Sequence, residues 1–123
     1  MNIKLNNLDL KTFTEQDALD YCQINNINHD NIVKLMLDNN KLTDISGIIF
    51  FKNIEELYLY NNETADISVL KDLNKLKYLD IDNLTLESDQ IQYINSLKKL
   101  KSLVCYKGFK DMKVIKQLNK KRF

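Results

Sequence analysis

The chain has 123 residues, of which 44% are hydrophobic and 28% are charged, and its formal net charge is +1. This is enough apolar material for one hydrophobic core, so a second domain is excluded. No stretch offers the roughly 18 consecutive apolar residues of a membrane helix, and residues 1–7 lack the apolar core of a signal peptide, so we expect a cytoplasmic protein, or one in a host cell's cytosol if it is viral or delivered.

Residues 1–31 are predicted to form an N-terminal cap. Apolar and polar residues alternate over residues 3–10, which indicates either a short hairpin or an extended cap strand. The segment from Thr14 to Asp17 matches a capping box, in which the Thr14 side chain caps a helix and the Asp17 side chain reaches back. We therefore expect a helix over about residues 14–24.

From residue 32 onward, an apolar pattern of the form L-x-x-L-x-L occurs four times. The copies start 22, 22 and 24 residues apart, a fixed period that marks a solenoid of stacked coils. In the first two copies, leucines at period two predict a short strand, and apolar residues spaced by three predict a helical segment after it. Neighbouring coils would then stack into a parallel sheet on one side and helical turns on the other. The four predicted repeats are 32–53, 54–75, 76–99 and 100–118.

The first two copies also share an Asn followed by an Asp-Ile-Ser triplet. We expect Asn40 and Asn62 to be buried amides that satisfy backbone groups where each coil leaves the sheet, with about 1 kcal/mol net from each hydrogen bond. The third copy has Leu84 at this position and the fourth has Gly108. The series of buried Asn side chains is therefore expected to end after two members.

The full pattern, L-x-x-L-x-L-x-x-N-x-L-x-D-I-S-x-L, resembles the leucine-rich repeat family over about residues 32–118. Its spacing is similar to the 22-residue class of bacterial internalins and of a eukaryotic phosphatase regulator. The resemblance implies an α/β fold: a short solenoid with a parallel concave sheet, short convex helical segments and a helical cap at each end. It also implies that the concave sheet binds protein.

The fourth repeat is predicted to merge into a basic cap helix that continues to residue 123. Residues 1–97 hold 8 Lys and Arg against 16 Asp and Glu, whereas residues 98–123 hold 10 against 1. Lysines beside an aromatic ring are one way to build a phosphate-binding patch, so nucleic-acid binding is the alternative function. The same lysines would also suit a solvated cap or contact with the acidic face of a second copy. The candidate basic patch is Lys107, Lys110, Lys113, Lys116 and Lys120.

Residues between the leucines of each predicted strand project from the sheet and form rows across the coils. Four of the six tyrosines fall at these positions, and tyrosine is favoured at interface hot spots. Strand propensity does not explain the acidic residues beside them, because carboxylates are depleted in strands. We predict a protein partner with a basic, or mixed basic and apolar, surface. The predicted contact residues are Met36, Asp38, Glu56, Tyr58, Tyr60, Tyr78, Asp80, Asp82, Val104 and Tyr106.

Catalytic chemistry finds little support in the sequence. His29 is the only histidine and has no Ser or Cys beside it, and Cys22 and Cys105 are expected to be free thiols. Asp80 and Asp82 project from one face, but no third type of ligand accompanies them, so we interpret them as recognition charges. No phosphate-binding loop or zinc motif is present. We therefore predict a non-enzymatic binding module without metal or cofactor, acting as an inhibitor, immunity factor or adaptor.

Overall fold

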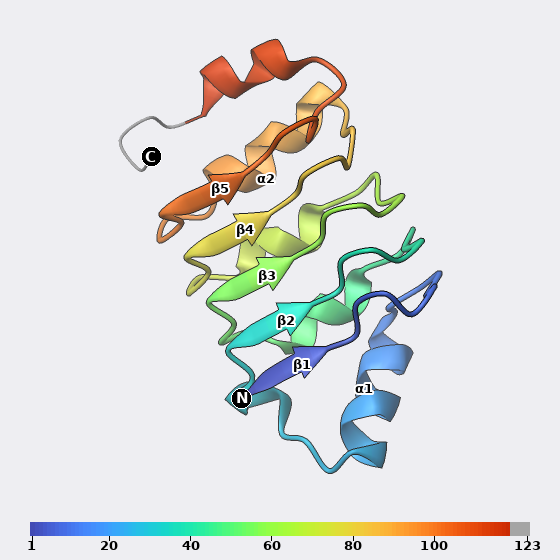
Figure 1. The fold of residues 1–123 in the computed structure, drawn as a ribbon. Helices are drawn as coiled ribbons and strands as arrows, with labels where there is room; N and C mark the ends of the chain where they lie inside the picture. The colour runs from blue at the N-terminus through green and yellow to red at the C-terminus, as the bar shows by residue number, and fades with distance from the viewer. Residues whose placement is uncertain (119–123) are drawn as a thin grey trace.

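The computed structural model describes residues 1–118, and strands alternate with helical segments along this chain (Figure 1). The strands are β1 (Asn2–Lys4), β2 (Lys34–Met36), β3 (Glu56–Tyr58), β4 (Tyr78–Asp80) and β5 (Ser102–Val104). The α-helices are α1 (Glu15–Ile24) and α2 (Ile91–Asn95). The 3₁₀ segments are His29–Asn31, Ser46–Phe50, Ser68–Asp72, Ser88–Gln90 and Met112–Gln117.

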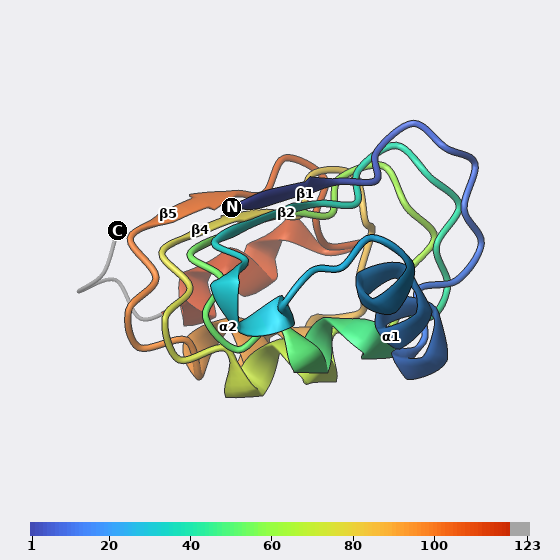
Figure 2. The same ribbon diagram turned by 90° about the horizontal axis from the view of Figure 1, so that it is seen from below.

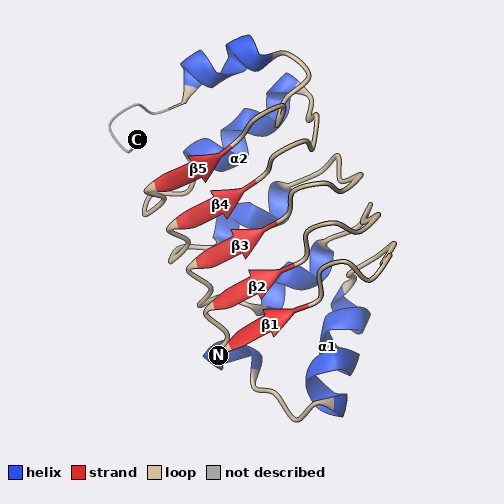
Figure 3. Cartoon of the chain, in the orientation of Figure 1, coloured by secondary structure: helices blue, strands red, loops and turns tan. Residues whose placement is uncertain are grey.

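The five strands form one parallel sheet in sequence order, from β1 to β5 (Figure 3). The helical segments lie in a second layer beneath the sheet (Figure 2). Leu35, Leu57 and Leu79 are register partners in adjacent strands, point into the space between the layers and are fully buried. The expected α/β solenoid, with a parallel sheet and short helical segments, is confirmed. No helix in residues 1–118 is both long and apolar enough to cross a bilayer.

The first residues of the chain form an additional coil at the N-terminal end. β1 pairs with β2 so that Ile3 lies opposite Leu35, and the Leu5 N–H continues the ladder by donating to the Met36 carbonyl. Of the two expected alternatives, the structure has the extended strand and not the hairpin. The offset between Ile3 and Leu35 is longer than the repeat because α1 is inserted between β1 and β2.

Helix α1 begins at the predicted capping box. The Thr14 hydroxyl accepts the Asp17 N–H at 3.1 Å, and the Asp17 carboxylate accepts the Thr14 N–H at 2.9 Å, which lowers the pKa of Asp17. Ala18 and Cys22 are the buried residues of α1, and the helix packs against the Ser46–Phe50 segment. Gly47 allows this close approach, because a Cβ atom there would lie 2.3 Å from the Thr14 carbonyl oxygen.

Asn40 and Asn62 tie successive coils together, as expected. The Asn62 amide oxygen accepts the Leu42 N–H at 3.0 Å, and its amide nitrogen donates to the carbonyls of Leu37 and Leu59 at 3.0 and 2.9 Å. Asn40 bonds in the same way to the coil that contains β1. The series ends at Leu84, which is buried.

A second Asn series runs one position earlier, at the surface, and was not predicted. Asn39, Asn61 and Asn83 have φ of 54°, 57° and 60°, a left-handed conformation that Asn tolerates better than most residues. The Asn61 amide donates to Asn39 at 2.7 Å, and the Asn83 amide donates to Asn61 at 3.1 Å. This series continues into the third repeat, where the buried series has ended.

The C-terminal end differs from the predicted cap helix. Residues Met112–Gln117 form a 3₁₀ segment, and the part of the prediction beyond residue 118 lies outside the described residues. The Asp111 side chain accepts the Lys113 N–H at 3.0 Å and so fixes the start of the segment. Val114 is then buried, whereas Met112, the first residue of the segment, is 40% exposed.

Replacing Asn62 with Ala should destabilise the protein by about 3 kcal/mol, because the Leu42 N–H and the Leu59 carbonyl lose their side-chain partner and the Leu37 carbonyl keeps only that of Asn40. Urea unfolding followed by circular dichroism measures this change. Asn74→Ala is the matched control, since the Asn74 side chain is exposed, and it should change stability by less than about 0.5 kcal/mol. Equal stabilities of the two variants would contradict the coupling role of Asn62.

Candidate partner-binding face

One side of the sheet is not covered by any helix or strand of residues 1–118 (Figure 2). We call this side the concave face; it carries the residues that alternate with the buried leucines. The strand register aligns these residues in rows, which confirms the predicted alignment of the four repeats and adds Asn2 and Lys4 from β1. The first row is Asn2, Lys34, Glu56, Tyr78 and Ser102, and the second is Lys4, Met36, Tyr58, Asp80 and Val104.

A third row follows where the strands end. The N–H groups of Asn39, Asn61 and Asn83 donate to the carbonyls of the neighbouring coil, which continues the same register. Asp38, Tyr60, Asp82 and Tyr106 are therefore aligned, as the repeat spacing predicts. All ten predicted contact residues lie on these three rows.

Two tyrosine rings form the centre of the concave face. The ring centroids of Tyr58 and Tyr78 lie 5.0 Å apart, with the planes inclined by 39°. The Lys34 ammonium lies 5.2 Å from the Tyr58 centroid, and the Tyr58 hydroxyl donates to Glu56 at 3.0 Å. Both rings are half-buried, so these contacts hold them in place while part of each stays accessible.

The acidic residues of this face are less exposed than their projecting positions predicted. Asp38 is fully buried and Asp80 is 8% exposed, although both were predicted to project from the sheet. Tyr60, the neighbour of Asp38 in the third row, interacts with it closely enough for Asp38 to raise the pKa of Tyr60. Asp80 also accepts the Asp82 N–H at 3.1 Å. Neighbouring side chains on the face therefore cover the carboxylates.

Burial and negative charge raise the pKa values of Tyr58, Tyr60, Tyr78 and Asp80 on this face. Burial, helped by the hydrogen bond to Glu56, raises the pKa of Tyr58 to about 12. Burial and nearby Asp80 raise the pKa of Tyr78, and the interaction with Asp38 raises that of Tyr60. The pKa of Asp80 is raised by burial, with Asp82 and Asp38 adding to it. The face therefore disfavours further negative charge.

The C-terminal coil continues the face with a different character. Val104 is half-buried, but Tyr106 is 73% exposed and lies outside the Tyr58 and Tyr78 pair. Its N–H donates to the Asp82 carboxylate, and the Lys107 ammonium lies 5.6 Å from its ring centroid. Tyr106 therefore lies between the acidic residues of the concave face and the lysines near the C-terminal end.

The candidate basic patch is an exposed surface. Lys107, Lys110, Lys113 and Lys116 are all exposed, and Lys110 pairs with Glu87. Lys120 lies outside the described residues. The patch is therefore carried by the turn after β5 and by the Met112–Gln117 segment.

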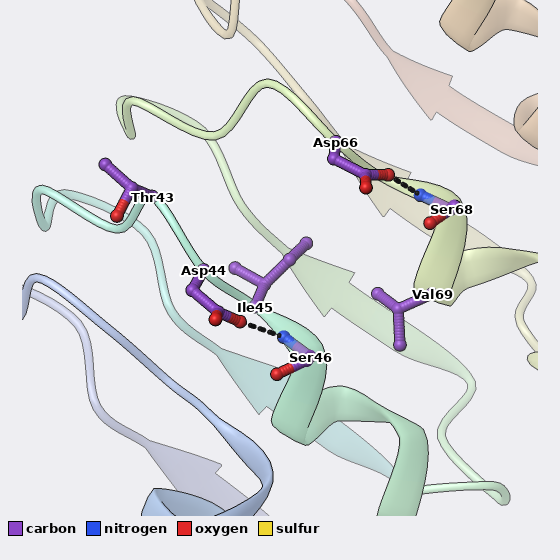
Figure 4. A pocket seen from close by; sticks show the side chains of 7 residues that line it. All are labelled: Thr43, Asp44, Ile45, Ser46, Asp66, Ser68 and Val69. Atoms are coloured by element: carbon purple, nitrogen blue, oxygen red, sulfur yellow. Dashed lines mark hydrogen bonds between the residues drawn. The ribbon is translucent and has the colours of Figure 1, made fainter.

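The first Asp-Ile-Ser triplet, together with Asp66 and Ser68 of the second, lines a cavity of about 320 Å³ on the helical side (Figure 4). Asp44 accepts the Ser46 N–H at 2.9 Å, and Asp66 accepts the Ser68 N–H at 2.8 Å, as the dashed lines mark. Bonds to Ser68 lower the pKa of Asp66. Both carboxylates thus hold the first turn of a 3₁₀ segment, which is a structural role.

Other groups with potential chemistry are also accounted for by packing. The His29 ring lies against Phe50 and Phe51, with centroid distances of 5.7 and 6.4 Å. Burial raises the pKa of both cysteines, and that of Cys105 reaches about 11, so both favour the unreactive thiol. Residues 1–118 contain no group of three or more His, Cys, Asp or Glu placed to hold a metal ion.

Residues 30–86 match the family model described as leucine rich repeat. The parallel strands and short helical segments of the same residues have the corresponding architecture. These coils are leucine-rich repeats. Leucine-rich repeat domains are typically non-catalytic modules that bind proteins. No curated protein matches the sequence of the whole chain.

Sequence reasoning missed the contribution of β1 to the face. Lys4 aligns with Met36, and Asn2 aligns with Lys34. The signal was present, because Ile3 and Leu5 repeat the spacing of the first two strand leucines of each leucine-rich repeat. It was obscured by the α1 insertion and by Leu8 at the position of the buried Asn.

Asp80→Asn should lower the pKa of Tyr78, since a negative charge that disfavours tyrosinate is removed. It should also leave the protein at least as stable at pH 7. The folded-state pKa of Asp80 is raised, so its charge opposes folding above that pKa, and the penalty disappears as pH falls below the unfolded value.

Titration of the tyrosine ring carbons by NMR, together with urea unfolding at several pH values, measures both effects. Asp72→Asn is the control, because Asp72 is exposed and lies away from the face. An unchanged Tyr78 titration in Asp80→Asn would contradict the electrostatic coupling.

Proposed function

We propose that this leucine-rich repeat protein binds a partner protein through its concave face. The observation that carries the proposal is the Tyr58 and Tyr78 pair, which is half-buried, fixed by Lys34 and Glu56, and surrounded by further projecting side chains. Rings held in one geometry lose little conformational entropy when a partner covers them. Tyrosines of this kind are common interface hot spots.

The charges of the face favour a partner with a basic, or mixed basic and apolar, surface. Among residues 1–118, the carboxylates of Asp38, Glu56, Asp80 and Asp82 form no ion pair. A cationic partner surface would reduce their mutual repulsion, whereas an acidic one would increase it. The apolar parts of Met36, Val104 and the tyrosine rings would contact apolar groups beside those cations.

Binding alone would produce the biological effect. We propose that the protein acts in the cytoplasm as an inhibitor, immunity factor or adaptor, by occupying a surface of its partner. The 22-residue offsets between β2, β3 and β4 further support the 22-residue repeat class, similar to that of bacterial internalins. Neither the role nor the repeat class requires a catalytic group.

The double variant Tyr58→Ala/Tyr60→Ala should lose the partner that the wild-type protein captures from its native cell. Both rings are removed from the face, and losses of about 2 kcal/mol or more per hot-spot residue reduce retention strongly. Affinity capture with quantitative mass spectrometry measures the loss, after circular dichroism has verified the fold. Leu19→Ala/Ile24→Ala is the matched control, since it removes two exposed apolar side chains of α1. Retention of every partner by the tyrosine variant would disprove the proposal.

A second candidate function is nucleic-acid binding at the basic end. It is favoured by the exposed Tyr106 ring beside Lys107, with Lys113 and Lys116 exposed on the next segment. An aromatic ring among lysines can stack a base while the lysines contact phosphates. This candidate uses a surface distinct from the tyrosine pair.

If the basic end binds nucleic acid, anisotropy of a labelled single-stranded oligonucleotide should rise with protein concentration and fall steeply as salt increases. Charge reversal at Lys113, Lys116 and Lys120 should abolish the signal. Reversal at Lys52 and Lys71 is the control, because those lysines lie on the helical side away from the patch. A flat titration at low salt removes this candidate.

A further inference from the structure

We propose that the partner anchors itself on the concave face with one arginine side chain, whose guanidinium binds the Asp38 carboxylate beside Tyr60 and Asp80. This inference rests on the proposed function and adds the identity of the central contact. It is carried by an unsatisfied buried oxygen, by the charge around it, and by the aromatic ring next to it.

The Asp38 side chain is fully buried, yet its Oδ1 atom has no hydrogen-bond partner in residues 1–118. The other oxygen, Oδ2, is 3.5 Å from the Asn39 amide nitrogen, which is a weak contact. Asp38 alternates with the buried Leu35 and Leu37, so its side chain is directed to the concave face. A buried carboxylate with an unpaired oxygen costs free energy unless a cation or a hydrogen-bond donor binds that oxygen.

Asp38 forms no ion pair with a lysine or arginine of residues 1–118. Asp80, on β4 two strands away, adds negative charge, and Asp38 itself contributes to the raised pKa of Asp80. The nearest lysine of the second strand, Lys34, is directed at the Tyr58 ring. Among the described residues, the lysines found in ion pairs contact Asp9, Glu55 and Glu87, all away from this position. The negative charge is therefore left without a cationic partner among residues 1–118.

The chemistry of the site favours a guanidinium over a metal ion or an ammonium. No set of three potential metal ligands is present in residues 1–118. A guanidinium is planar, weakly hydrated and carries five N–H donors, so it can bond to two carboxylates at once and stack on an aromatic ring. Asp38 provides the carboxylate and Tyr60 provides the ring, and the negative charge of Asp80 adds to the attraction.

Tyr60 closes the site in the free protein. Its hydroxyl lies near enough to the Asp38 carboxylate that Asp38 raises the pKa of Tyr60, and its ring is half-buried in the third row. An arriving guanidinium would displace the hydroxyl and donate to the unsatisfied Oδ1 of Asp38. Rotation of the Tyr60 side chain would then place its ring against the guanidinium plane.

The experiment titrates the full chain with acetyl-Gly-Arg-Gly-amide and follows backbone amide shifts by NMR. The expected result is a saturable shift at Asp38, Asn39, Tyr60 and Asp80. The citrulline peptide, which has the same shape without charge, should bind about tenfold more weakly or not at all, and the lysine peptide about threefold more weakly. Equal binding of citrulline overturns the charge requirement, and equal binding of lysine overturns the choice of arginine.

Asp38→Asn keeps the shape of the side chain and removes its charge, so it should weaken arginine-peptide binding by at least about fivefold. Asp72→Asn, the same change at an exposed position, should leave binding unchanged. If Asp38→Asn does not fold, Asp80→Asn takes its place, with the same expected loss. Unchanged affinity in the folded variant overturns the proposal.

The two sets of variants distinguish a failure of the arginine anchor from a failure of the proposed function. If Asp38→Asn retains the captured partner while Tyr58→Ala/Tyr60→Ala loses it, the face binds protein and the arginine anchor is wrong. If both variants retain the partner, the concave face itself is not the binding surface. If both lose it and the arginine peptide gives the expected shifts, both statements stand.

Discussion

The buried amides of Asn40 and Asn62 are the interaction on which the rest of the structure depends. A coil of this length cannot by itself provide partners for all the backbone N–H and C=O groups where it leaves the sheet. The chain there runs toward the core, where no water is available to bond to these groups. Each amide bonds to the strand end of its own coil and to backbone of the coil before it. The same contact therefore closes one coil and fixes its register against the next. Leucines provide the free energy of burial, but their attraction is not directional and would tolerate a shifted stack.

Fixed register explains why the concave face is organised in rows. A slip by one residue would exchange inward and outward side chains, so the order of the tyrosines and carboxylates depends on the same bonds that hold the core. The third repeat keeps this register without a buried Asn, by means of β4 pairing and the surface amide of Asn83. Its longer return, with α2 as an extra helical turn, lies on the helical side and leaves the face unchanged. The scaffold and the concave face thus share their geometry but not their residues.

Much of this arrangement could be predicted from the sequence, and the failures have physical causes. Leucines at period two identified β2, β3, β4 and β5, because burial of one strand face leaves a periodic signal. β1 was harder to recognise, since α1 lengthens its coil and Leu8 replaces the expected Asn. Alternation correctly placed Asp38 on the concave face, but it could not show that the side chain is fully buried, because burial there depends on neighbouring coils. The 3₁₀ form of Met112–Gln117 was missed for a similar reason: its spacing fits both helix types, and the Asp111 cap decides which residues face inward.

The long first coil has a consequence for how such a protein changes over evolution. Register offsets between adjacent strands are 32, 22, 22 and 24 residues, yet all five strands pair in the same way. Closing a loop of 32 residues rather than 22 costs only about 0.3 kcal/mol of chain entropy, far less than the loss of one buried hydrogen bond. Insertions between strands are therefore inexpensive wherever the Asn or strand contacts survive. Lineages of this fold can acquire whole helices at the back of a coil while the pattern presented by the sheet is inherited intact.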